Sequence, residues 1–153
     1  MIIRVRGYND GFGDYLRTGK KQGVTLHRDE LDKRLILHGD LDITEQVVNA
    51  MLNNGDDRYL HITLGFKEDY ISNELLKTVI DEFRSELFNA YDEDEYVFYA
   101  EAHLPKIKSV LNESTGEMEE RKPHIHIIVP KINMCDGSYL SPVGFYPHNE
   151  RYI

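Results

Sequence analysis

The distribution of apolar and polar residues predicts five β-strands. Residues 2–6 alternate apolar and basic side chains, as a short strand with one buried face does. Residues 35–37, Leu-Ile-Leu, form a second short strand that ends before Gly39, and residues 59–66 form a third. Residues 96–104 are rich in aromatic side chains and residues 123–129 in isoleucine. Because β-branched and aromatic side chains favour the interior of a sheet, these last two segments are expected to be central strands.

Two segments have the apolar spacing of amphipathic helices. The first is predicted to begin with a cap at Asp42 or Thr44 and to end before Gly55. The second and longer helix is predicted to begin at Ser72. Its apolar face is formed by Ile71, Leu75, Leu76, Val79, Ile80, Phe83, Leu87 and Phe88. Residues 14–23 are short, basic and flanked by turns, which indicates a loop or a brief helix.

The order of these elements predicts an α+β fold. Strands and helices follow one another as β, loop, β, α, β, α, β, β, which suits an antiparallel five-stranded sheet with helices on one face. The chain has 153 residues, of which 41% are hydrophobic, enough for one core. We therefore expect residues 1–153 to form a single domain.

Charge and cysteine content narrow the functional classes. The net charge is −9, which argues against binding nucleic acid over the whole surface. Residues 1–34 hold eight Lys or Arg and five acidic side chains, so they carry +3 and the remainder −12. The lone Cys135 excludes an intrachain disulfide and suits a reducing compartment. With no long apolar segment, we expect a cytoplasmic protein without a membrane segment.

The sharpest chemical pattern is the pair His124 and His126. Side chains two residues apart on a strand leave the same face, so these imidazoles project together, while Ile125 and Ile127 project oppositely. A lone histidine is more often a core residue. Two on one face, with isoleucines on the other, favour a shared metal ion.

A third histidine joins the pair if residues 96–104 and 123–129 form a hairpin. A turn centred between Glu113 and Ser114 sets His103 opposite His124, within reach of the same ion. Three imidazoles bind a divalent metal such as Mn, Mg or Zn, and the sequence does not choose among them. Glu101 shares the face of His103 and is a candidate catalytic residue that orients a ligand histidine or a water.

These motifs resemble the HUH endonuclease superfamily. Residues 123–129, Pro-His-Ile-His-Ile-Ile-Val, match its histidine-hydrophobe-histidine signature, and His103 takes the place of the upstream ligand. Residues 14–20, Asp-Tyr-Leu-Arg-Thr-Gly-Lys, are similar to the tyrosine segment of conjugative and mobilisation relaxases. The resemblance implies a relaxase-like sandwich related to ferredoxin and RRM folds. Relaxase domains continue well past the His-x-His strand, so the catalytic domain is expected to be shortened at its C-terminus.

The resemblance implies a mechanism. A metal ion on His103, His124 and His126 would bind the scissile phosphate of single-stranded DNA at a transfer origin. Tyr15 would attack it, leaving a 5′-phosphotyrosine and a free 3′-hydroxyl. This reaction starts conjugative transfer or plasmid mobilisation, with accessory DNA-binding and coupling proteins as further partners. Tyr8 is the reserve nucleophile.

Basic residues near these motifs are candidate DNA contacts. They are Arg17, Lys20, Lys21, Lys106 and Lys122. Ordinary solvated lysines explain the pair near residues 106–122 equally well.

Three alternatives stay open. A rolling-circle replication initiator shares the signature but keeps its tyrosine on a later helix. A metal-bearing DNA-binding module without chemistry would keep the histidines alone. His61, in Leu-His-Ile-Thr, is a candidate site-lining residue and resembles half of a two-histidine phosphoesterase signature. The second half of that signature is absent at His124-Ile-His126, so we rank this reading lowest.

Overall fold

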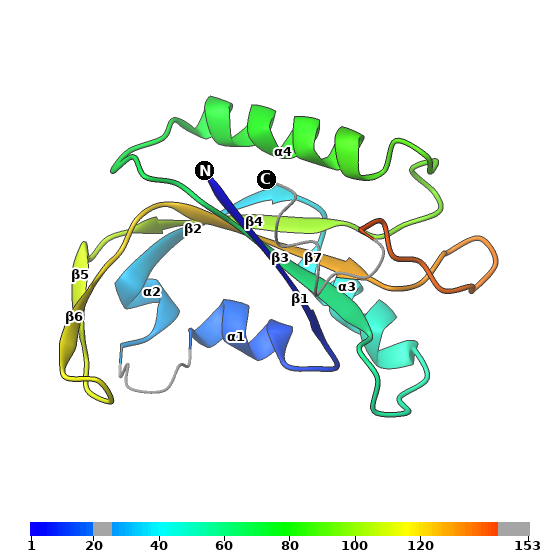
Figure 1. Ribbon diagram of the computed structural model, residues 1–153, viewed down its shortest axis with the longest axis horizontal. Coiled ribbons are helices and arrows are strands. Elements are labelled where there is room, and N and C mark those ends of the chain that lie inside the picture. Colours follow the sequence, from blue (N-terminus) through cyan, green and yellow to red (C-terminus); the bar gives the residue numbers. More distant parts are fainter. Residues whose placement is uncertain (20–25, 144–153) are drawn as a thin grey trace.

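A five-stranded antiparallel sheet forms the centre of the molecule (Figure 1). The structure is a computed structural model that describes residues 1–19 and 26–143. From edge to edge the strands are β1 (Ile2–Tyr8), β3 (Tyr59–Gly65), β7 (His124–Pro130), β4 (Tyr99–Pro105) and β2 (Asp32–His38). The predicted α+β class and antiparallel five-stranded sheet are confirmed.

Helix α4 (Asn73–Leu87) covers one face of the sheet (Figure 1). It begins where the sequence predicts, because the side chain of Ser72 accepts a hydrogen bond from the Leu75 N–H and caps the helix. Leu76 and Ile80 are fully buried and share a core with Ile127 of β7. This core anchors the back of the strands that carry the histidines.

The remaining helices lie on the other face. They are α1 (Phe12–Thr18), α2 (Arg28–Leu31) and α3 (Leu41–Ala50). Leu16 of α1 and Val48 of α3 share a second core with Tyr99 and Ile128 of the sheet. The prediction of helices on one face was therefore wrong. Ile127 and Ile128 point to opposite faces and both are buried, so this central strand carries apolar side chains on each side.

The hairpin between β4 and β7 has the register that the sequence predicts near the sheet. His103 pairs with His124, and Glu101 pairs with His126. Beyond the sheet the arms continue as β5 (Ser109–Asn112) and β6 (Glu117–Glu120). There Ser109 pairs with Glu120, whereas an unbroken ladder would pair it with Met118. The register shift thus falls outside the histidine pair and leaves it aligned.

No helix in the described part of the chain has the length and apolar character needed to cross a membrane.

Candidate metal centre

Three neighbouring strands bring polar side chains to the sheet face that α1 partly covers. Thr63 of β3 and Glu101 of β4 flank His126 of β7 as direct partners. On the neighbouring row, Gly65 and His103 flank His124. Because directly opposed residues project to the same side, the histidines of β4 and β7 converge.

His103, His124 and His126 together offer three nitrogen ligands. One ring nitrogen from each lies within 4.8 Å of the other two. Nδ1 of His103 and Nε2 of His126 are buried and have no hydrogen-bond partner among the described residues. A buried polar atom without a partner costs free energy, which a bound metal ion would remove. The triad can therefore hold a metal ion, as the sequence predicts.

The opposite nitrogen of each ring is held by a hydrogen bond. Nε2 of His103 lies 2.5 Å from Oε2 of Glu101, and Nδ1 of His124 donates to the Lys122 carbonyl over 2.9 Å. Nδ1 of His126 lies 2.8 Å from Nε2 of His61. In metal sites such outer bonds fix the ring orientation and the tautomer.

Glu101 is fully buried and its carboxylate is saturated with donors. Arg34 makes two hydrogen bonds to it, of 2.9 and 2.7 Å, and the Tyr99 hydroxyl donates over 2.8 Å. Burial alone would raise the pKa of this carboxyl, but the bonds from His103 and Arg34 outweigh burial and hold the pKa at about 2. The lowered pKa keeps the Glu101 carboxylate ionised, and this carboxylate orients His103.

Burial keeps the imidazoles neutral, which is the protonation state that binds metal. It lowers the pKa of both His61 and His124 to about 4. The pKa values of His103 and His126 are lowered by the same cause, and for His126 the neighbouring His103 and His124 add to the effect.

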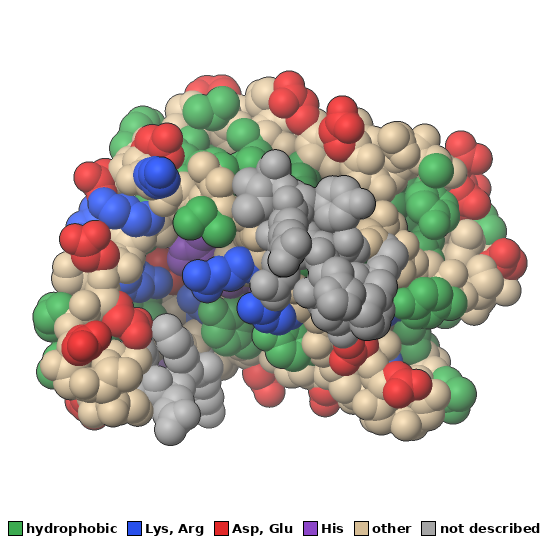
Figure 2. Space-filling model, viewed as in Figure 1, with side chains coloured by type: hydrophobic (Ala, Val, Ile, Leu, Met, Phe, Trp, Pro, Cys, Tyr) green, Lys and Arg blue, Asp and Glu red, His purple; other side chains and the backbone are tan. Residues whose placement is uncertain are grey.

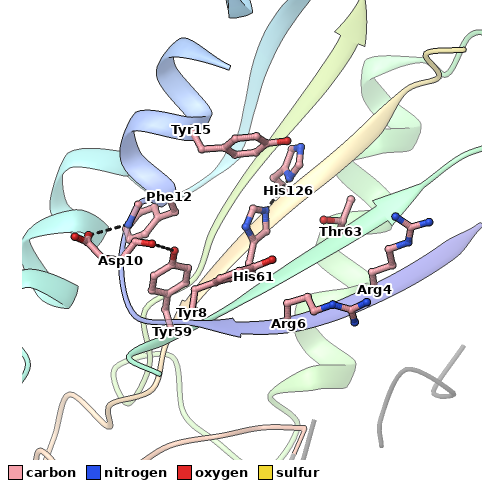
Figure 3. A pocket seen from close by; sticks show the side chains of 11 residues that line it. Arg4, Arg6, Tyr8, Asp10, Phe12, Tyr15, Tyr59, His61, Thr63 and His126 are labelled. Atoms are coloured by element: carbon pink, nitrogen blue, oxygen red, sulfur yellow. Dashed lines mark hydrogen bonds between the residues drawn. The ribbon is translucent and has the colours of Figure 1, made fainter. Parts of the chain in front are cut away.

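Tyr15 reaches across this face from α1 (Figure 3). Its ring centroid lies 5.6 Å from that of His126 and 6.0 Å from that of His61. The guanidinium of Arg28 lies 5.0 Å from the ring centroid and donates to the Tyr15 carbonyl. The reserve nucleophile Tyr8 is on the edge strand, with its ring 6.0 Å from that of His61.

Tyr15 lines two pockets on this face. One, of about 460 Å³, is shared with His61, His126 and Thr63. The other, of about 190 Å³, is shared with His124, Arg121 and Lys122. The phenol therefore lies between two pockets, each of which is also lined by a triad histidine.

The predicted DNA contacts are scattered. Arg17 is paired with Asp42 and Glu45 of α3 and lines neither pocket, and Lys106 donates to the Asp29 carbonyl. Lys122 lines the smaller pocket beside His124, although it also pairs with Asp69. Lys20 and Lys21 lie outside the described residues.

Three residues of the larger pocket were not predicted from the sequence as site residues. Arg4, Arg6 and Thr63 line the larger pocket. The signal was present, because the alternation in residues 2–6 puts Arg4 and Arg6 on one face of the strand. The sequence does not specify which strand lies beside residues 2–6; in the structure it is β3.

No family model, curated protein or solved structure matches this chain.

Proposed function

We propose that the chain is the catalytic part of a DNA relaxase, which nicks single-stranded DNA at a transfer origin through a phosphotyrosine at Tyr15. The observation that carries this proposal is the position of Tyr15. Its ring lies 5.6 Å from that of His126, whose Nε2 is one of the orphaned ligand atoms of the triad. A nucleophile beside a metal-binding triad is the arrangement that phosphoryl transfer needs.

A metal ion on the three imidazoles would neutralise charge on the scissile phosphate and favour the phenolate form of the attacking tyrosine. Nitrogen ligands favour Zn or Mn over Mg, because Mg prefers oxygen.

The residues of the chain perform the remaining steps. Tyr15 forms a bond from Oη to phosphorus, and the bond from phosphorus to the 3′ oxygen breaks. The phenolic proton leaves to water in the open pocket, and the 3′ oxygen gains a proton from water. The phosphodiester energy is kept in the tyrosine ester, so the same site can later rejoin strands. Glu101 acts through His103 as a positioning residue, since its carboxylate has no exposed surface.

The position of the phenol also favours Tyr15 over a tyrosine that follows the His-x-His strand. Tyr139 lies near Lys131, at the end of β7 opposite to His124. Tyr146 and Tyr152 are outside the described residues. A rolling-circle initiator is therefore the less favoured reading.

The two-histidine phosphoesterase reading is also disfavoured. That mechanism needs a phosphate between two histidines, but His61 and His126 are hydrogen-bonded directly to each other over 2.8 Å.

The test is an adduct assay with labelled single-stranded oligonucleotides that tile the DNA flanking the gene. Each oligonucleotide is incubated with the protein and Mn²⁺ or EDTA, and the products are separated on a denaturing gel. We expect a protein-linked band that requires Mn²⁺, persists in Tyr8→Phe and is lost in Tyr15→Phe. A metal-dependent band that survives Tyr15→Phe assigns the nucleophile elsewhere. If a folded, metal-loaded protein gives no band, the relaxase mechanism is wrong and the site only binds.

A further inference from the structure

The larger pocket continues the metal centre toward the edge of the sheet. Across the strands, Glu101, His126, Thr63 and Arg4 are direct partners in one row. Arg6 pairs with His61 in the next row. Figure 3 shows the side chains of Arg4 and Arg6 on the same side of the sheet as Thr63, His61 and His126.

Arg4 is one of two arginines that line this pocket. The Arg4 side chain is exposed and forms no ion pair or hydrogen bond within the described residues 1–19 and 26–143. Among the described residues that line the pocket, Asp10 is the one acid; it lies at the Tyr8 end and accepts a hydrogen bond from the Gly11 N–H. Figure 2 shows Lys and Arg side chains beside a histidine in the centre of this view, with acidic side chains mostly around the rim.

Neutral groups of the pocket add donors. The Thr63 hydroxyl can donate. His61 lines the same pocket, and its Nε2 lies 2.8 Å from Nδ1 of His126.

The pocket is also at the right distance from the triad. Arg4 and His126 are two strands apart, which is about 10 Å between their backbones at the usual strand spacing. A guanidinium extends several bonds from the backbone, so Arg4 can hold one phosphate of an extended strand while a neighbouring phosphate lies at the triad.

We propose that this pocket is a second phosphate site, in which Arg4, supported by Thr63 and His61, binds a phosphodiester flanking the scissile one on the same DNA strand. The proposal rests on the proposed function and adds the direction of the DNA, which crosses the sheet from the triad toward β1. A local phosphate site of this kind explains how a protein with a net charge of −9 binds DNA at one part of its surface.

The test is a scan with methylphosphonate linkages, which are neutral, in an oligonucleotide that forms the adduct, or, if none does, in the oligonucleotide that binds most tightly. Binding is measured with Tyr15→Phe protein in Mn²⁺, so that no strand is cut. We expect a methylphosphonate at one linkage to lower the affinity about 3- to 10-fold, and where an adduct forms this linkage should lie within two nucleotides of the scissile one. The loss at that linkage should disappear in a protein that also carries Arg4→Gln.

Lys33→Gln is the matched control, since Lys33 is exposed on β2 and pairs with Leu104 on the α4 side of the sheet. In the protein with Lys33→Gln, the methylphosphonate at that linkage should still lower the affinity for DNA. Arg4→Gln should also lower the slope of log affinity against log salt by about 0.7, whereas Lys33→Gln should not change it at this site.

The outcomes separate this proposal from the nickase. Suppose the adduct forms, but each methylphosphonate lowers the affinity of the protein with Arg4→Gln by the same factor as that of the Tyr15→Phe parent. The second phosphate site is then wrong and the nickase stands. If no adduct forms but the coupling to Arg4 is present, the second site stands and the nickase fails. If no oligonucleotide binds, both proposals are overturned.

Discussion

One hydrogen bond decides which nitrogen of His126 can face a metal ion. Its Nδ1 lies 2.8 Å from Nε2 of His61, which leaves the buried Nε2 of His126 as the ligand atom. Burial lowers the pKa of His61 to about 4, so this ring is neutral at physiological pH and can accept the His126 proton. His61 is thus a positioning residue for the triad.

Replacing His61 should weaken metal binding without abolishing it. We expect His61→Leu, which has no acceptor, to lose about 10- to 100-fold in affinity for Zn²⁺ or Mn²⁺, the range typical of such outer contacts. His61→Gln, which restores an acceptor, should recover part of the loss. Competition with a chelating dye measures both.

His38→Leu is the control, because His38 lies on β2 against Phe98 and outside the triad. The metal affinity of His38→Leu should equal that of the unaltered protein. Equal affinity in His61→Leu would show that the bond to His126 does not organise the site.

The triad could be predicted because its geometry is local. The spacing of His124 and His126 fixes a shared face, and one hairpin register adds His103. The contacts of His61 and Arg4 depend on the strand order β1-β3-β7, which joins segments far apart in the sequence. No short-range pattern specifies that order, so Arg4 was missed and the role of His61 was left open.

At the scale of elements, α1 determines where Tyr15 lies. The helix has only seven residues, between Gly11 with φ 103° and Gly19 with φ 69°. Its carbonyls at Tyr15 and Leu16 accept hydrogen bonds from the buried Arg28 over 2.8 and 3.1 Å. So short a helix is stabilised by such contacts rather than by its own propensity.

Arg28→Lys should therefore loosen α1 while leaving the triad intact. Lysine keeps the charge beside Asp32 but cannot reach both carbonyls, so we expect a loss of about 1–3 kcal/mol in the free energy of unfolding. Urea titration measures the loss. Metal affinity should not change, while the adduct should form more slowly because Tyr15 is less well placed.

A drop in metal affinity equal to that of His61→Leu would contradict this division of roles. It would show that α1 and the triad form one cooperative unit.

The elements predicted from sequence were those with strong periodicity. Ser72 and the apolar face after it specify α4, and both central strands were recognised from composition. Helix α1 was predicted only as a loop or brief helix, since seven residues show too little periodicity. Which face each helix covers was not predictable, because residues such as Tyr99 and Ile128 are apolar whether they meet α1 or α4.

At the scale of the molecule, the buried histidines couple stability to pH. In the folded protein the pKa values of His61 and His124 are about 4, against an ordinary 6.5 for an unfolded chain. Between these values the unfolded chain binds protons that the folded chain does not. Stability is therefore full above the unfolded pKa and is lost as pH falls toward the folded one.

We expect the unfolding temperature of the protein in EDTA to fall steadily from about pH 7 to about pH 4. Circular dichroism at a series of pH values measures it. His61→Gln, which removes one of these groups, should show a shallower dependence. A flat or rising profile would mean that these histidines are accessible to protons in the folded protein.

The central claim, a metal ion held by His103, His124 and His126, is tested most directly by calorimetric titration of the metal-free protein with Zn²⁺ and Mn²⁺. We predict one ion per chain, and loss of that binding in His103→Gln, His124→Gln and His126→Gln variants whose circular dichroism shows an intact fold. Absence of binding, or binding that survives all three substitutions, would contradict the account.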